Sequence, residues 1–295
     1  MSLTVKNMDY EIGNDRILDQ ISLEIKEGEF VGLVGPNGCG KSTLLKHIYR
    51  TYKPKGQTIF LDGKDIMELS AKKLAAAMAV MAQENQLEFD FTVRDMVMFG
   101  RYAHKKFLEG DTAKDRELCE KYLREVGLSG CETRSYLSLS GGEKQKIACA
   151  GASIMEPDVL VMDEPSSNLD ASSILDLRAT LAFWKSQGKT VIVSEHRLYY
   201  LRGLADRFIY ITAGKVEKDY SAAEFERLTE QQRVNLGLRT FILEDLLPPK
   251  ALPPAREQME LHNFCFAYKN ESETLHIREC EIPANRIVGI IGNNG

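Results

Sequence analysis

The sequence lacks any apolar run long enough to cross a lipid bilayer. Its longest apolar stretches, such as residues 31–34 and 159–162, have the length of single strands, whereas a transmembrane helix needs about 20 apolar residues. A signal-peptide pattern is also absent after Met1, where a strand-like alternation begins instead. These two absences predict a chain that does not itself span a membrane and that works in the cytoplasm.

A basic surplus and a paired-cysteine motif are absent as well. The chain has 38 Lys and Arg against 43 Asp and Glu, a net charge of −5, while proteins that bind a nucleic-acid backbone are usually basic. We therefore expect no nucleic-acid partner. The six cysteines occur singly, without a CxxC pair, which argues against a zinc site and is typical of reduced thiols in the cytosol.

Apolar residues make up 43% and charged residues 27% of the 295 residues, which suits a chain with a buried core and a solvated surface. Continuous apolar runs at 29–34, 157–162 and 190–193 are typical of parallel strands covered on both faces. Helix-like segments separate these runs, and the longest of them lies at 92–155. The pattern predicts an α/β fold with a helical insertion.

The chain begins again after a proline-rich stretch at residues 246–255. Residues 259–295 repeat the order of the first residues: a strand, an aromatic residue, then an apolar strand that enters a glycine loop. The aromatic residue and the first glycine are 25 positions apart in the first copy and 24 in the second. We expect a first domain, a helical extension with a stiff linker, and the truncated start of a second domain, at 1–220, 221–258 and 259–295.

A glycine-rich loop follows the first apolar strand and precedes a helix-like segment. It reads Gly-Pro-Asn-Gly-Cys-Gly-Lys-Ser and fits the pattern G-x-x-x-x-G-K-[ST]. In this setting backbone N–H groups surround the β-phosphate of a nucleotide, Lys41 reaches the β- and γ-phosphates, and Ser42 offers a hydroxyl to Mg²⁺. The alternative, a glycine turn that fits by accident, is disfavoured by the strand–loop–helix order. The expected nucleotide-binding residues are Gly35, Pro36, Asn37, Gly38, Cys39, Gly40, Lys41, Ser42 and Thr43.

Two acids end the apolar strand at 157–162. Asp163 is placed to hold Mg²⁺, as acids beside such loops do, and Glu164 is placed to polarise an attacking water. The alternative is an ordinary strand end with solvated acids. The presence of the glycine loop makes this alternative less favoured.

The segment Leu-Ser-Gly-Gly-Glu lies between these motifs and opens a helix. Adjacent Gly141 and Gly142 after Ser140 would bare backbone N–H groups at a helix N-terminus, which suits an anion. The alternative is helix capping alone, because Ser140 and Glu143 also form an acceptable capping box.

In this order the motifs resemble those of an ATP-binding-cassette (ABC) transporter ATPase. The resemblance implies an ABC nucleotide-binding domain over residues 2–220. It would have a P-loop NTPase core sheet, an N-terminal antiparallel β-subdomain and a helical subdomain at about 86–155. The resemblance also implies that Tyr10 stacks on adenine, that Gln83 takes part in catalysis and binds Mg²⁺, that Asp170 lies in a loop at the nucleotide, and that His196 contacts the γ-phosphate. Taken singly, each of these four residues could have a purely structural place.

The resemblance points to two kinds of transporter. The first half is similar to ATPases of siderophore, heme and cobalamin importers, and the linker with its second cassette resembles tandem ATPases of energy-coupling-factor vitamin transporters. The resemblance implies an ATP- and Mg²⁺-dependent motor on the inner face of the cell membrane. Its partners would be transmembrane permease subunits and a second ABC domain, in a homodimer or a tandem. The alternatives are a soluble tandem-cassette ATPase acting on the ribosome and a non-catalytic nucleotide-dependent scaffold.

Overall fold

The structure is a computed structural model that describes residues 1–82, 89–106, 109–243, 257–267 and 275–289. The chain divides into two compact units, Met1–Leu246 and Leu247–Asn293, and each is described by itself. No helix within the described residues is both long and apolar enough to cross a membrane.

The central element of the first unit is a six-stranded sheet with the strand order β10-β9-β3-β8-β7-β6. Five of its strands run parallel, and β10 pairs antiparallel with β9. Every residue of β3, β7 and β8 is buried, as their continuous apolar runs predict. The strands are β3 (Phe30–Val34), β6 (Met78–Met81), β7 (Val159–Asp163), β8 (Thr190–Ser194), β9 (Arg207–Thr212) and β10 (Lys215–Ser221).

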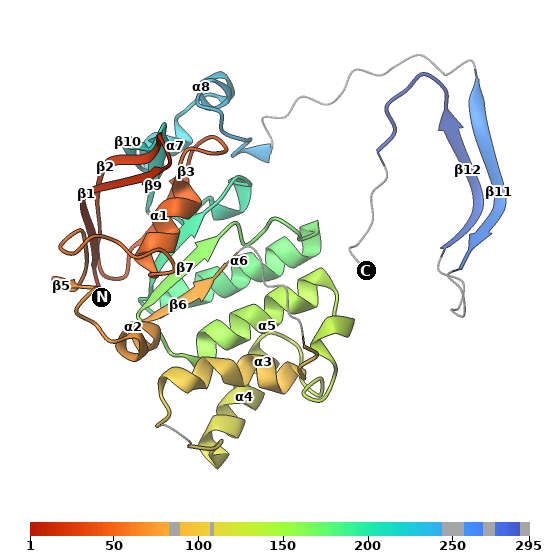
Figure 1. Ribbon diagram of the computed structural model, residues 1–295. Coiled ribbons are helices and arrows are strands. Elements are labelled where there is room, and N and C mark those ends of the chain that lie inside the picture. Colours follow the sequence, from red (N-terminus) through yellow and green to blue (C-terminus); the bar gives the residue numbers. More distant parts are fainter. Residues whose placement is uncertain (83–88, 107–108, 244–256, 268–274, 290–295) are drawn as a thin grey trace. The chain divides into compact units, whose positions relative to one another are not determined.

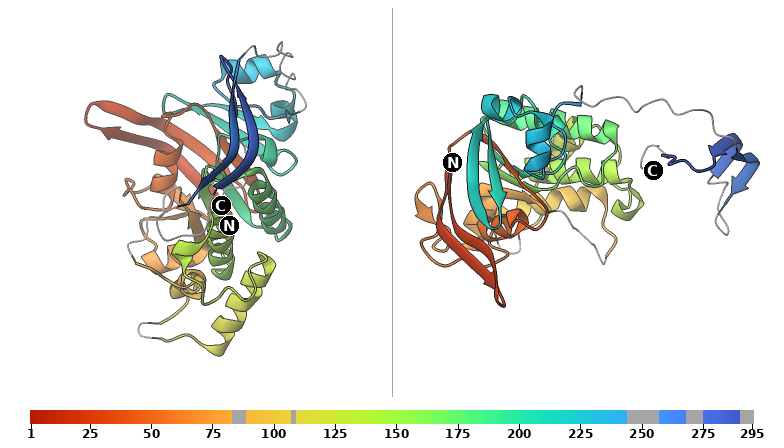
Figure 2. Two further views of the ribbon diagram at one scale, coloured as in Figure 1. Left: turned by 90° about the vertical axis from the view of Figure 1, so that its right-hand side faces the viewer. Right: turned by 90° about the horizontal axis from the view of Figure 1, so that it is seen from above.

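A second, antiparallel sheet has the order β2-β1-β4-β5. Figure 2 shows the β1–β2 hairpin projecting from the rest of the first unit. The register of β1 against β2 shifts three times between Val5 and Glu11, so the regular alternation of faces along β1 is interrupted. The strands are β1 (Leu3–Ile12), β2 (Asp15–Ile25), β4 (Ile59–Leu61) and β5 (Lys64–Asp65).

Helices cover both faces of the six-stranded sheet. Leu44 and Leu45 of α1 share one buried cluster with Val161, while Leu177 and Leu181 of α6 share the opposite one with neighbouring Leu160. Successive strand residues therefore enter different clusters, because side chains alternate across a sheet. The helices here are α1 (Lys41–Ile48), α2 (Ala71–Ala77), α6 (Ala171–Ser186), η3 (Tyr199–Leu201), α7 (Ala222–Glu226) and α8 (Glu230–Asn235). The predicted α/β fold is confirmed.

A helical group within the predicted segment 86–155 has its own buried core. Val97, Leu123 and Ile147 belong to one apolar cluster that includes residues of α3, α4 and α5, and Figure 1 shows these helices together at one end of the unit. The elements are α3 (Val93–Met98), η1 (Phe99–Ala103), α4 (Ala113–Glu125), η2 (Tyr136–Ser138) and α5 (Gly141–Ile154).

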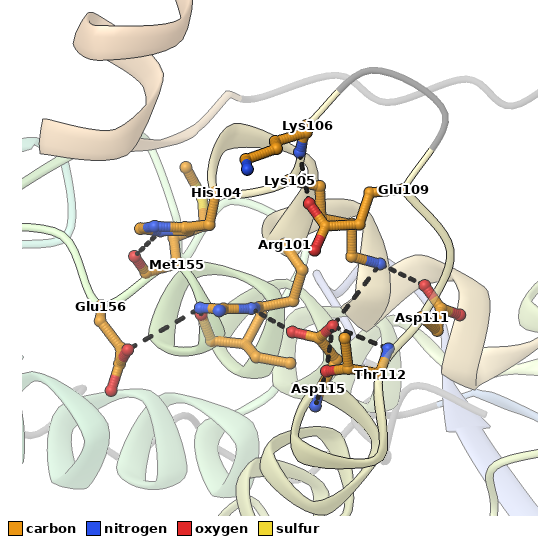
Figure 3. Close-up of polar contacts among 11 residues, drawn as sticks. Arg101, His104, Lys105, Lys106, Glu109, Asp111, Thr112, Asp115, Met155 and Glu156 are labelled. Atoms are coloured by element: carbon orange, nitrogen blue, oxygen red, sulfur yellow. Dashed lines mark hydrogen bonds and ion pairs between the residues drawn. The ribbon is translucent and has the colours of Figure 1, made fainter.

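A buried ion-pair network ties this helical group together (Figure 3). Arg101 Nε lies 2.9 Å from Asp115 Oδ1, and the two side chains are 12% and 7% exposed. Arg101 also donates to the carbonyl of Ile154 at the end of α5 (3.1 Å), while Asp115 caps α4 through Thr112. Burial raises the pKa of Asp115, but hydrogen bonds from Thr112 and Arg101 and the charge of Lys105 outweigh it and bring the pKa to about 2.

Replacing Asp115 is expected to destabilise the unit in a pH-dependent way. Asp115→Asn leaves the Arg101 charge without its partner, so the free energy of unfolding should fall by about 3 kcal/mol at neutral pH. Because the folded-state pKa lies below the ordinary value of 3.8, the contribution of Asp115 is fully present above about pH 4 and is lost as pH falls through about 2. Urea unfolding should therefore give free energies of unfolding for parent and variant that become equal in acid.

Asp111→Asn is the control for this variant, because it alters a carboxylate 46% exposed beside Lys105. Its expected effect on the free energy of unfolding is smaller. A difference between parent and Asp115→Asn that stays undiminished near pH 2 would contradict the prediction.

The second unit contains an antiparallel hairpin of β11 (Gln258–Phe266) and β12 (Leu275–Pro283), paired from Gln258 with Pro283 to Phe266 with Leu275. Several of its apolar side chains are exposed, among them Phe264 at 45% and Phe266 at 46%. Tyr268 and the second glycine loop, residues 292–295, lie outside the described residues.

Candidate functional site

The glycine-rich loop connects β3 to α1, as predicted, and its backbone has room only for glycine at two positions. Gly35 and Gly40 have φ angles of +152° and +104°. A Cβ on Gly35 would lie 2.0 Å from the carbonyl oxygen of Ile211, and one on Gly40 would lie 2.9 Å from that of Ile17. The loop is therefore tightly seated against the neighbouring strands, and a larger side chain at either position would displace it.

Lys41 is buried at 5% exposure, and its ammonium lies under the loop. Nζ donates to the carbonyl oxygens of Gly35 (2.9 Å) and Pro36 (3.1 Å), and it lies 3.6 Å from Cys39 Sγ. A positive charge is thus held by neutral carbonyls at the start of α1, where the helix dipole adds further positive potential. The arrangement favours an anion at the loop.

Ser42 and Asp163 are hydrogen-bonded at one edge of the sheet, although 121 positions separate them in the sequence. Ser42 Oγ donates to Asp163 Oδ1 at 3.0 Å, and Asp163 is 4% exposed. A hydroxyl and a carboxylate are hard oxygen ligands that Mg²⁺ accepts, and Mg²⁺ on a nucleotide usually takes only one or two protein ligands because phosphate oxygens and waters supply the rest. The pair therefore fits a nucleotide-bound Mg²⁺. Gln83, the third predicted ligand, lies outside the described residues.

Glu164 and His196 lie together beside this pair. His196 Nε2 is 3.3 Å from Glu164 Oε1. Burial raises the pKa of Glu164, helped by the charges of Asp163 and Glu195, while burial lowers the pKa of His196, helped by the charge of Lys41. The lowered pKa favours a neutral imidazole at pH 7, so the 3.3 Å contact does not neutralise Glu164 as an ion pair would, and the carboxylate is able to accept a proton.

The backbone of Glu164 is strained, with a φ angle of +49°, and its N–H donates to the carbonyl oxygen of Ser194 at 2.9 Å. A non-glycine residue in this region is uncommon, and such strain persists only where the surroundings impose it. The turn directs the chain away from β7 directly after Asp163.

A buried carboxylate that the sequence analysis did not single out holds the histidine loop. Glu195 is 2% exposed and accepts four hydrogen bonds: from the N–H groups of Ser166 (3.1 Å), His196 (2.6 Å) and Arg197 (2.9 Å) and from Tyr200 Oη (2.8 Å). The signal in the sequence that could have identified Glu195 is its position directly before His196. Glu195 positions the histidine backbone.

Most of these residues line one cavity of about 570 Å³, whereas Asp163 lines a second cavity together with Glu164 and Gly141. The wall of the first cavity includes Lys41, Ser42, Thr43, Glu164 and His196, together with loop residues 37–40. The structure thus brings most of the predicted loop together with Glu164 and His196, two of the three candidate catalytic residues.

The structure shows the surroundings of Tyr10, and its stacking on adenine stays a prediction. Its ring packs against His47, with ring centroids 4.4 Å apart, and against Tyr52 at 5.7 Å, and it does not line the cavity. Ile12 and Ile17 line it instead. The irregular register of β1 turns Tyr10 toward α1 and leaves Ile12 at the strand end, 53% exposed.

Ser140, Gly141 and Gly142 do not line this cavity. Ser140 caps α5 in a reciprocal capping box with Glu143, as the structural alternative predicts. A Cβ on Gly142 would lie 2.3 Å from Ser173 Oγ, so glycine allows the starts of α5 and α6 to approach. Asp170 caps α6 by accepting from the N–H of Ser173 (2.7 Å) and also lies outside the cavity wall.

Comparisons with known proteins agree with this geometry. The family model described as "ABC transporter" matches residues 18–167. The hemin import ATP-binding protein HmuV of Bordetella avium is 35% identical over 232 residues, which cover 76% of this chain and 88% of the relative. A putative ABC transporter ATP-binding protein of Treponema denticola is 30% identical over 311 aligned positions, covering 99% of this chain and 62% of the relative. The structure of cbiO1 from Clostridium perfringens, part of the ABC transporter complex cbiONQ, is 28% identical with a TM-score of 0.67, covering 79% of this chain and 92% of that one.

Proposed function

This chain belongs to the ABC transporter family and is an ATP-binding, ATP-hydrolysing enzyme, and from that premise we propose that it is the motor subunit of a membrane importer for a micronutrient. The observation that supports the site assignment is the single cavity in which the glycine loop, Lys41 and Ser42 meet Glu164 and His196. A non-catalytic scaffold would have no need of a proton-accepting carboxylate paired with a neutral histidine at that place.

Each residue of the cavity has a proposed task. Lys41 and the loop N–H groups bind the β- and γ-phosphates, and Ser42 and Asp163 would hold Mg²⁺, which neutralises phosphate charge when bound. Glu164 orients the attacking water and accepts its proton, while His196 donates a hydrogen bond toward the γ-phosphate. Gln83 completes the set in this proposal.

A second cassette is part of the proposal. Ser140, Gly141 and Gly142 lie outside the cavity of their own chain, although they begin a helix that suits an anion. We assign them, with Asp170, to the nucleotide of a facing cassette, in a homodimer or a tandem. The second unit is then the start of a second cassette, which the alignment with the Treponema protein over 99% of this chain supports.

The proposed setting is the cytoplasmic face of the cell membrane, with transmembrane permease subunits as partners. Hemin import in the Bordetella relative supports heme as the imported class, while relatives named for import of cobalamin and of iron(3+)-hydroxamate support cobalamin or an iron siderophore. Another vitamin stays in the proposal from the resemblance of the linker and second cassette. Co-purification tests this: the tagged chain, extracted in mild detergent from cells that also express its candidate permease, should elute with that membrane protein. Recovery with ribosomes, and not with the permease, would refute the importer and favour the soluble alternative.

A further inference from the structure

The segment at residues 236–241, directly after α8, lies against the glycine loop. Gly237 has a φ angle of +69°, and a Cβ on it would lie 3.3 Å from Cβ of Pro36. A side chain at position 237 would be crowded against Pro36, so this close approach favours glycine. The segment and the loop are therefore in direct contact, although about 200 positions separate them in the sequence.

Both ends of segment 236–241 are fixed to the core of the first unit. The carbonyl oxygen of Leu236 accepts from Tyr210 Oη at 3.0 Å, and the N–H of Leu238 donates to the carbonyl oxygen of Arg233 at 2.9 Å. Phe241 is 1% exposed and packs edge-on against Phe225, with ring centroids 5.1 Å apart. A residue between these anchors has a defined position.

Arg239 stands between the anchors and forms part of the wall of the nucleotide cavity, with Lys41, Glu164 and His196. The residue is exposed to solvent. Burial dominates the pKa shifts of Glu164 and His196, and the positive charge of Arg239 lowers the pKa of both. The other arginine of this wall, Arg197, donates to the carbonyl oxygen of Leu169 at 2.8 Å.

We propose that Arg239 binds the terminal phosphate of a nucleoside triphosphate and thereby favours ATP over ADP. A guanidinium offers several donors to phosphate oxygens in a planar fork, and this one lies in the same cavity wall as Glu164 and His196. Arg239 comes from the C-terminal extension, outside the residues 18–167 that match the family model. The inference rests on the proposed nucleotide site.

The test compares the affinities of the full chain for two ligands, a non-hydrolysable ATP analogue and ADP, both with Mg²⁺, by calorimetry. Arg239→Ala should weaken binding of the triphosphate by roughly tenfold. This is the lower end of the range for loss of a charge-assisted hydrogen bond, because the site is open to solvent. The same variant should change ADP binding by less than about twofold. Arg239→Lys should recover part of the preference. Arg227→Ala removes the same charge from an exposed position after α7 and should change neither affinity.

An unchanged ratio of triphosphate to diphosphate affinity in Arg239→Ala, or an equal loss for both ligands, would overturn the inference. If parent and Arg227→Ala also bind neither ligand, the proposed site itself fails, which is a different result. Thermal unfolding of each variant separates these outcomes from loss of folding.

Discussion

Glu164→Gln is expected to lower ATP turnover by about 10²–10⁴-fold while MgATP still binds. The amide keeps the size of the side chain and its contact with His196, 3.3 Å away in the parent, but it cannot accept a proton from water. Phosphate release measures the turnover, and calorimetry measures the binding. In the presence of a partner cassette the variant should also accumulate as an ATP-bound dimer.

The pH dependence gives this prediction a second readout. Because burial and the charges of Asp163 and Glu195 raise the pKa of Glu164 above its ordinary value of 4.5, turnover of the parent should fall as pH drops through that raised pKa. The residual rate of Glu164→Gln should lack this acid limb. Glu156→Gln, at a carboxylate 55% exposed in the helical group, is the matched control. Turnover of Glu164→Gln equal to that of the parent would mean that another group activates the water.

Lys41→Ala is expected to weaken MgATP binding by about tenfold to a hundredfold, which corresponds to roughly 1.5–3 kcal/mol for a lost charged hydrogen bond. The buried ammonium is held by the Gly35 and Pro36 carbonyl oxygens, so it is already placed at the loop before a phosphate arrives. Calorimetric titration with MgATP measures the change.

The control for this variant lies on the same helix. Lys46→Ala removes an ammonium that stands over the ring of Tyr52, 5.5 Å from its centroid, and that does not line the cavity. It should bind MgATP as the parent does. Equal affinity of Lys41→Ala and parent, with similar melting temperatures, would refute the assignment of the loop.

The positions of site residues that could be predicted from the sequence are those fixed by local order. A buried strand, a glycine loop and a helix follow one another without interruption, so Lys41 and Ser42 must lie at the start of the helix. The acids that end β7 reach the same edge because β3 and β7 are parallel strands of one sheet. The same rule places Glu164 and His196 together, since each follows the end of a parallel strand.

Tyr10 could not be placed by counting from the loop. Three register shifts between β1 and β2 change which side chains face the cavity, and a shift of one position reverses the face of a strand residue. Glu195 and Arg239 were missed for a different reason. Glu195 depends on a tertiary contact with the turn at Ser166, and Arg239 reaches the cavity wall through the tertiary placement of its segment, where Gly237 lies against Pro36. No periodicity in the sequence indicates either placement.

The carboxylate of Glu195 has a mechanical consequence for the site. It fastens the Ser166 N–H, four positions before the Asp170 cap of α6, to the N–H groups of His196 and Arg197. One carboxylate thus links two turns that follow different strands. A displacement of the turn at Ser166 is therefore passed directly to the backbone of His196. Of the four hydrogen bonds to Glu195, the one from the Ser166 N–H joins the two turns, because the other three come from His196, Arg197 and Tyr200 on the same segment as the carboxylate. Loss of that one bond would remove this link.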